Sequence, residues 1–216
     1  MKKILNLIFR IKDGHFKSCP YKFPKSIDIE PICECEERRY KAVLIIGLNM
    51  FALEFLGGIL TNSLSLLGDS LHLFANSMAI IAAIWIAKMS AKHKAQEGIL
   101  RQAGVLFNGS LLLLISAYLL YASFCKFLSP SGTAGFYMLL IAKIGIWGNF
   151  LQRYILVSVT GDSRKIDLLQ SFAVVLGGVC IVFVSDTRIS FLIDPFVSAG
   201  IGFTMARDSL KLIYKL

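Results

Sequence analysis

Charged side chains are scarce in this chain, and their scarcity argues against most soluble folds. Of the 216 residues, only 17% are charged and 56% are hydrophobic, and the mean hydropathy is +0.66. Such values are typical of an integral membrane protein and rare in a soluble domain of this length. The net charge of +9 does not indicate nucleic-acid binding, because the basic residues lie at the ends of apolar stretches.

Signals for secretion and for enzymatic chemistry are also lacking. The apolar run near the N-terminus is short and is interrupted by Arg10 and Lys12, so no cleavable signal peptide is expected. No Gly-rich phosphate loop, Ser/His/Asp order or reactive cysteine context indicates an enzyme. Five cysteines, an odd number at these spacings, do not form a secreted disulfide framework.

Long apolar runs are what the chain has in abundance. Each run is long enough for a helix to cross the hydrocarbon core, which takes ~20 residues. We therefore predict an all-α membrane protein, a six-transmembrane-helix bundle over residues 41–216, preceded by a polar tail over residues 1–40. The six runs lie near 42–61, 64–87, 99–127, 134–157, 166–185 and 190–212.

The distribution of basic residues predicts the orientation. All but three of the 23 Lys and Arg residues fall in the tail, around the second and fourth connections, or near the C-terminus. Lys126 and Arg188 lie on the opposite side, and Lys143 lies inside the fourth run. By the positive-inside rule, both termini are expected in the cytoplasm. The expected location is a membrane that the chain crosses several times.

Two apolar runs carry polar faces. Asp69, His72 and Asn76 are spaced i, i+3 and i+7 on the second run, and Asp167 and Ser171 are spaced i, i+4 on the fifth. Ionisable groups at membrane depth usually mark an ion path, a proton relay or a buried pair. The alternative is that these groups only hydrogen-bond between helices.

The same two faces could hold a divalent cation in a four-coordinate site. Imidazole and carboxylate suit Zn²⁺, Mn²⁺ or Fe²⁺, whereas Asn and Ser are weaker, neutral ligands. A histidine must be neutral to bind a metal, so metal binding would release protons. This coupling would give a route to proton antiport.

Lys143 lies near the middle of the fourth run. If it is buried, it requires a carboxylate partner, and the candidates are Glu54, Asp69 and Asp167. An ion pair there, for example with Glu54, would modulate the cation site. The alternative is that Lys143 lines a water-filled vestibule.

The tail carries a second candidate metal site. Cys19, Cys33 and Cys35 lie near one another with His15 upstream, and thiolates bind Zn²⁺ or Cu⁺. The alternative is a set of free thiols in a reducing cytoplasm.

These residues resemble the cation diffusion facilitator family of zinc and manganese efflux transporters, in particular a short bacterial branch that lacks the C-terminal domain. The resemblance rests on 49–54 of the first run, 62–72 of the second, Asn149 of the fourth and 194–198 of the sixth.

The resemblance implies efflux of zinc, or of Mn, Fe or Co, in exchange for protons. The implied metal positions are His72, Asn76, Asp167 and Ser171, with Asp69 in the approach or behind the ligands. No permanently bound cofactor is implied, and the implied partners are divalent metal ions, protons, the lipid bilayer and a second copy of the chain. The alternative function is a transport-impaired relative that serves as a partner subunit or metal sensor, because Asn76 and Ser171 are neutral and Lys143 lies inside the fourth run.

Overall fold

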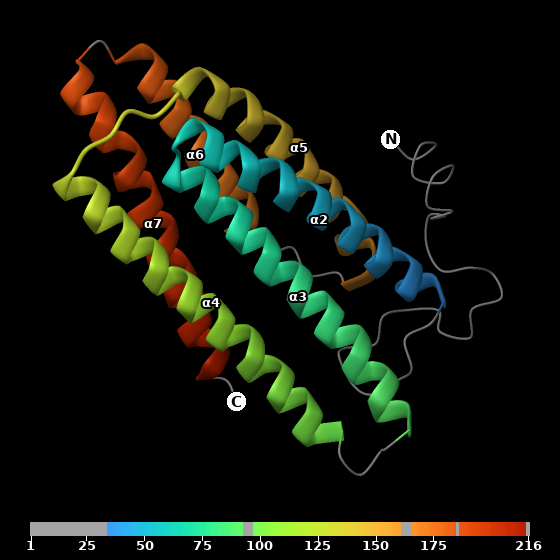
Figure 1. The fold of residues 1–216 in the computed structure, drawn as a ribbon. Coiled ribbons are helices and arrows are strands. Elements are labelled where there is room, and N and C mark those ends of the chain that lie inside the picture. Colours follow the sequence, from blue (N-terminus) through green and yellow to red (C-terminus); the bar gives the residue numbers. More distant parts are fainter. Residues whose placement is uncertain (1–33, 93–96, 161–165, 185, 215–216) are drawn as a thin grey trace.

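Six α-helices make up the described part of the chain. The computed structural model describes residues 34–92, 97–160, 166–184 and 186–214, and it forms no strand there (Figure 1). Within these helices, the side chains of 34–39, 87–88, 90–92, 97, 101, 156–160 and 166–169 lie outside the described set. The helices are α2 (Glu34–Thr61), α3 (Leu64–Lys92), α4 (Glu97–Leu128), α5 (Gly135–Thr160), α6 (Ile166–Phe183) and α7 (Thr187–Ile213).

Each helix coincides with one of the six predicted runs, which confirms the all-α fold. Four helices, α2, α3, α4 and α7, are long and apolar enough by themselves to cross a membrane, and the apolar part of α6 is shorter. Two boundaries differ from the prediction. Helix α2 already begins inside the predicted tail, and α7 begins at Thr187, so Pro195 lies inside the helix instead of near its start. The Asp186 carboxylate caps α7 by accepting the backbone N–H of Arg188 at 2.9 Å.

The helices run antiparallel to their neighbours in sequence, and α3 lies at the centre. Helix α3 contacts α2, α4, α6 and α7. The start of α2 and the end of α7 lie at one end of the bundle (Figure 1). We call the other end, which holds the turn between α2 and α3, the hairpin end. Which end faces the cytoplasm stays a prediction.

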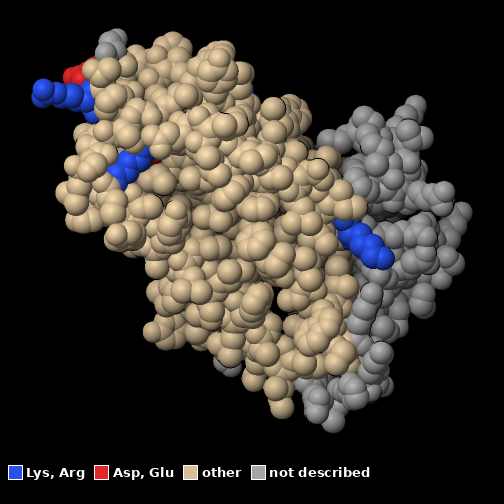
Figure 2. Space-filling model, viewed as in Figure 1, with Lys and Arg blue, Asp and Glu red and all other residues tan. Residues whose placement is uncertain are grey.

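Large apolar side chains cover the outside of the bundle as well as its interior. Leu66 and Leu119 are fully buried in the core, whereas Trp147 and Phe183 are 72% and 79% exposed. Figure 2 shows a face on which charged side chains occupy only a few places. A surface of this kind suits hydrocarbon and not water.

The turn between α2 and α3 is tight and left-handed. Asn62 has a φ of 54°, a conformation that Asn tolerates better than most residues. The Ser63 N–H donates to the Gly58 carbonyl at 2.9 Å, and the Asn62 N–H donates to the Ile59 carbonyl at 3.2 Å. This is the Schellman pattern of a helix end. It lets α3 start only three residues after α2 ends.

Candidate functional site

The predicted polar face of α3 is turned into the bundle. Asp69 and His72 are buried, and Asn76, one turn further along, is half-buried. Their common face follows from helical spacing, since residues three, four and seven apart lie on one side of a helix. The central position of α3 therefore places these groups among four neighbouring helices.

A chain of hydrogen bonds joins this face to α5 and α6. The Ser171 hydroxyl of α6 donates to Asp69 Oδ2 at 2.8 Å. Asn149 Nδ2 of α5 donates to the same Ser171 oxygen at 2.6 Å. All three side chains are buried. The structure thus brings two predicted site residues together, Asp69 and Ser171, and adds Asn149, which sequence reasoning did not assign to the site.

Asp167, the other predicted ligand on α6, lies in the first turn of that helix, and its side chain is outside the described set. Among the residues that the structure describes, no three His, Cys, Asp or Glu side chains converge to hold a metal ion. The ligand set therefore stays a prediction. The tail residues Cys19 and Cys33 lie outside the described residues, as does the side chain of Cys35.

Glu54 of α2 is a further buried carboxyl group beside this site. It is fully buried, and neither of its oxygens accepts a hydrogen bond from the described residues. It interacts electrostatically with Asp69. Two carboxylates so placed repel each other strongly unless a proton or a cation offsets their charge.

Lys143 is not the partner of Glu54. It is exposed on the outer surface of α5, so the prediction of a buried lysine paired with a carboxylate is wrong. The reason is the helical phase of α5. Its inner face carries the small residues Ala142, Gly145 and Gly148, whereas Trp147, one turn after Lys143, is also exposed.

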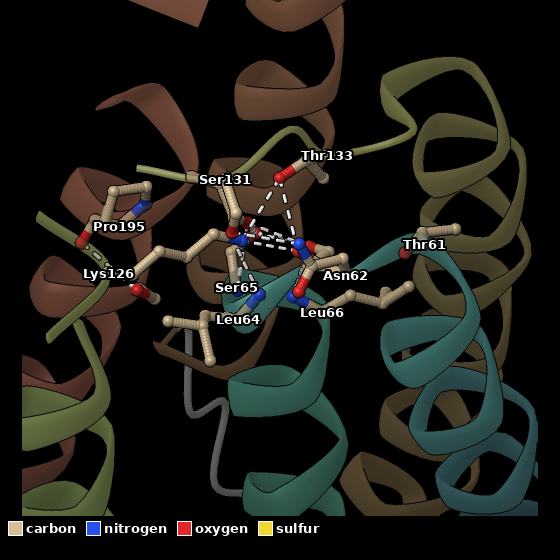
Figure 3. Close-up of polar contacts among 12 residues, drawn as sticks. Thr61, Asn62, Leu64, Ser65, Leu66, Lys126, Ser131, Thr133 and Pro195 are labelled. Carbon is tan, nitrogen blue, oxygen red and sulfur yellow. Dashed lines mark hydrogen bonds and ion pairs between the residues drawn. The ribbon is translucent and has the colours of Figure 1, made fainter. Parts of the chain in front are cut away.

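The lysine that does form a buried ion pair is Lys126, at the end of α4. Its Nζ lies 2.9 Å from Oδ2 of Asp194 on α7, and both side chains are buried. Lys126 also donates to the Asn62 carbonyl and, at 3.2 Å, to Thr133 Oγ1. Figure 3 shows its side chain reaching toward Asn62 and Thr133 from the opposite side of the cluster.

Asp194 also completes the start of α3. Its Oδ1 accepts the Ser63 hydroxyl at 2.8 Å, the Ser65 hydroxyl at 2.6 Å and the Ser65 N–H at 3.1 Å. Its Oδ2 accepts the Leu64 N–H at 2.8 Å. The Leu66 N–H, in turn, donates to Ser63 Oγ at 3.2 Å. The first three N–H groups of α3, which have no partner within the helix, are therefore satisfied.

We call this set the hairpin-end cluster: Asn62, Ser63, Ser65, Lys126, Thr133 and Asp194. Sequence reasoning did not identify it, because Lys126 was counted as a charge outside the membrane. Asp194, within the sixth apolar run, could have indicated the cluster, since a charged group buried at that depth requires a partner. The cluster has every member hydrogen-bonded, which is the pattern of a structural ion pair.

The chain matches known transport proteins. The cation efflux transmembrane domain matches residues 41–216. The chain is 29% identical to the cadmium, cobalt and zinc/H(+)-K(+) antiporter of Bacillus subtilis, over 80% of this chain and 63% of that protein. It is 30% identical to the cation efflux system protein CzcD of an Alcaligenes species, over 82% of this chain and 61% of that protein. It is 26% identical to the zinc transporter ZitB of Pectobacterium atrosepticum, over 82% of this chain and 58% of that protein.

The chain spans less than two thirds of the length of each of these relatives. The domain match, however, covers most of the chain and all six helices apart from the first residues of α2. The apolar helices agree with a multi-pass membrane protein. The chain therefore belongs to the cation diffusion facilitator family, whose members are transporters and not enzymes.

Proposed function

We propose that this protein exports a divalent cation from the cytoplasm, zinc or a chemically similar ion, in exchange for protons. The names of three relatives mention zinc, cadmium, cobalt, cation efflux or H(+). The observation that carries the proposal is the hydrogen bond between Ser171 and Asp69, because it sets the register of α6 against α3.

In that register, the proposed ligands on the two helices would lie within a few turns of one another along the bundle axis. Helices α3 and α6 run in opposite directions, so residues after Asp69 on α3 lie beside residues before Ser171 on α6. At 1.5 Å rise per residue, His72 lies ~4.5 Å and Asn76 ~10 Å along the axis from the Asp69–Ser171 pair, and the Asp167 backbone lies ~6 Å along it in the same direction. The Asp167 backbone is thus level with the interval between His72 and Asn76.

In this proposal His72 and Asp167 are the main ligands, and Asn76 supports them. Asp69 and Ser171 act behind the ligands, because their hydrogen bond holds the two helices in register. Imidazole nitrogen and carboxylate oxygen are ligands that Zn²⁺ accepts. His72 must give up its proton to bind the cation, which couples cation binding to proton release.

The test is zinc flux in proteoliposomes under an imposed pH gradient. The double variant His72→Ala, Asp167→Ala is expected to lose gradient-driven zinc flux. Asn49→Ala is the matched control, since Asn49 is exposed and its side chain donates to the Ile45 carbonyl of its own helix. Unchanged flux in the double variant would show that the cation is held elsewhere.

A second candidate function is a transport-impaired partner subunit or metal sensor. The observation that favours it is that the Ser171 hydroxyl is already engaged by Asn149 and Asp69, which leaves His72, Asp167 and the neutral Asn76 as the proposed ligands. The second candidate predicts no saturable zinc binding within the six-helix part, which calorimetry on the purified protein measures. Saturable zinc binding that Asp167→Ala abolishes would count against the second candidate.

A further inference from the structure

Glu54 is the buried ionisable group that the proposed cation site does not use. It lies about two turns before the end of α2, is fully buried, and both its oxygens lack a hydrogen-bond donor among the described residues. An ionised carboxylate in such surroundings carries a large desolvation cost, which a neutral carboxylic acid avoids for the most part. The position is therefore suited to a carboxyl group that holds a proton.

The Glu54 carboxyl group packs directly against the backbone of α5 at Gly145. A Cβ atom on Gly145 of α5 would lie 1.9 Å from Glu54 Oε1 and 3.0 Å from its Cδ. A larger residue at position 145 would therefore require the Glu54 carboxyl group to shift. The contact is one of a series along α2 and α5, in which Gly148 is placed against Met50 in the same way.

The charged groups around Glu54 are few. Helices α3 and α5 pack against α2. From α3, the group that interacts electrostatically with Glu54 is the carboxylate of Asp69. On α5, Lys143 points outward. Glu54 makes no ion pair with a cation among the described residues, and a proton is the counter-charge that needs no further ligands.

A buried polar group also lies where α2 packs against α5, further from the hairpin end than Glu54. Gln152 Nε2 of α5 is buried without a hydrogen-bond acceptor among the described residues. It lies 3.5 Å from the point that a Cβ atom on Gly47 would occupy. Ser77 Oγ of α3 lies 2.9 Å from the same point. These groups lie two turns of α2 from Glu54, on the side predicted to face the cytoplasm.

We propose that Glu54 binds and releases one of the protons exchanged for the cation, at a site between α2 and α5 that is separate from the ligands on α3 and α6. The proposal rests on the proposed exchange function. A divalent cation is the less suitable occupant, because it requires several ligands and neither Glu54 oxygen has a hydrogen-bonding neighbour among the described residues. The proton moves between water and a Glu54 carboxyl oxygen, and no other bond changes.

The first test detects the proton directly and does not depend on transport. Infrared spectra of the purified full chain, recorded near neutral pH, are expected to contain the carbonyl stretch of a protonated carboxylic acid. This band should be absent in Glu54→Gln and shifted in Gly145→Ala, where a methyl group displaces the carboxyl group. A spectrum of Glu54→Gln identical to that of the unchanged protein would overturn the proposal, whether or not the protein transports zinc.

The second test separates proton coupling from cation binding. Proteoliposomes containing Glu54→Gln are expected to lose zinc uptake driven by a pH gradient but to retain exchange of zinc for zinc, which requires no net proton movement. Retention of gradient-driven uptake in Glu54→Gln overturns the proposal. Loss of both gradient-driven uptake and zinc-for-zinc exchange in a folded variant would mean that Glu54 is a cation ligand, which overturns it too. Absence of both modes in the unchanged protein contradicts the proposed function instead, and the infrared band then decides on Glu54.

Glu54→Asp is the second variant. It keeps the carboxylic acid but shortens the side chain by one methylene group, so the infrared band is expected to persist and gradient-driven uptake to be reduced and not lost. Size-exclusion profiles and thermal unfolding identify variants that fail to fold. If Glu54→Gln does not fold, a missing band in Glu54→Asp overturns the proposal.

Discussion

Asp194 and Glu54 are two fully buried carboxyl groups in one bundle, and their surroundings are opposite. Asp194 accepts five hydrogen bonds, from Ser63, Leu64, Ser65 and Lys126. Glu54 accepts none from the described residues and is placed near a second carboxylate. The first arrangement stabilises an ionised group, and the second stabilises a group that carries a proton. Burial alone therefore does not distinguish a structural carboxylate from a functional one.

Asp194→Asn is expected to have the largest effect on stability. It removes the charge that offsets Lys126, and breaking one side of a buried ion pair costs about 3–5 kcal/mol. The free energy of unfolding, from equilibrium titration in mixed micelles, measures this loss.

Lys126→Met is the matched control for Asp194→Asn. It leaves Asp194 with four of its donors, so it should cost less than Asp194→Asn. An equal or larger cost would mean that the lysine, and not the capping of α3, provides most of the stabilisation.

Ser171→Ala is expected to have an intermediate effect. It removes the donor to Asp69 and the acceptor of Asn149, both in buried positions, and an unmade buried hydrogen bond costs about 1–3 kcal/mol. Ser116→Ala is the control, since the buried Ser116 hydroxyl donates to the Leu113 carbonyl of its own helix. Equal unfolding free energies for the two variants would argue against a register role for Ser171.

Glu54→Gln is expected to have the smallest effect on stability, within about 1 kcal/mol, because an amide closely replaces a neutral carboxylic acid and leaves no charge unpaired. It is the same chemical change as Asp194→Asn, so the pair compares the two sites directly in one unfolding assay. A loss as large as that of Asp194→Asn would mean that Glu54 is ionised in the folded protein.

The helices could be predicted because each apolar run is long and ends in polar residues. The face shared by Asp69 and His72 could also be predicted, since spacing along one helix fixes it. The direction of Lys143 could not, because an apolar run by itself does not show which side of α5 packs inward; in the structure, the side with Gly145 and Gly148 does. The Lys126–Asp194 pair joins residues 68 apart, and nothing in the local sequence of either predicts the other.

The hairpin-end cluster has a mechanical consequence. The left-handed turn at Asn62 couples α2 to α3, and the same turn is held by Lys126 of α4, Thr133 of the following loop and Asp194 of α7. The groups that hold this turn therefore come from four helices and one loop, so a substitution at Asp194 or Lys126 alters the contacts of α2, α3, α4 and α7 together.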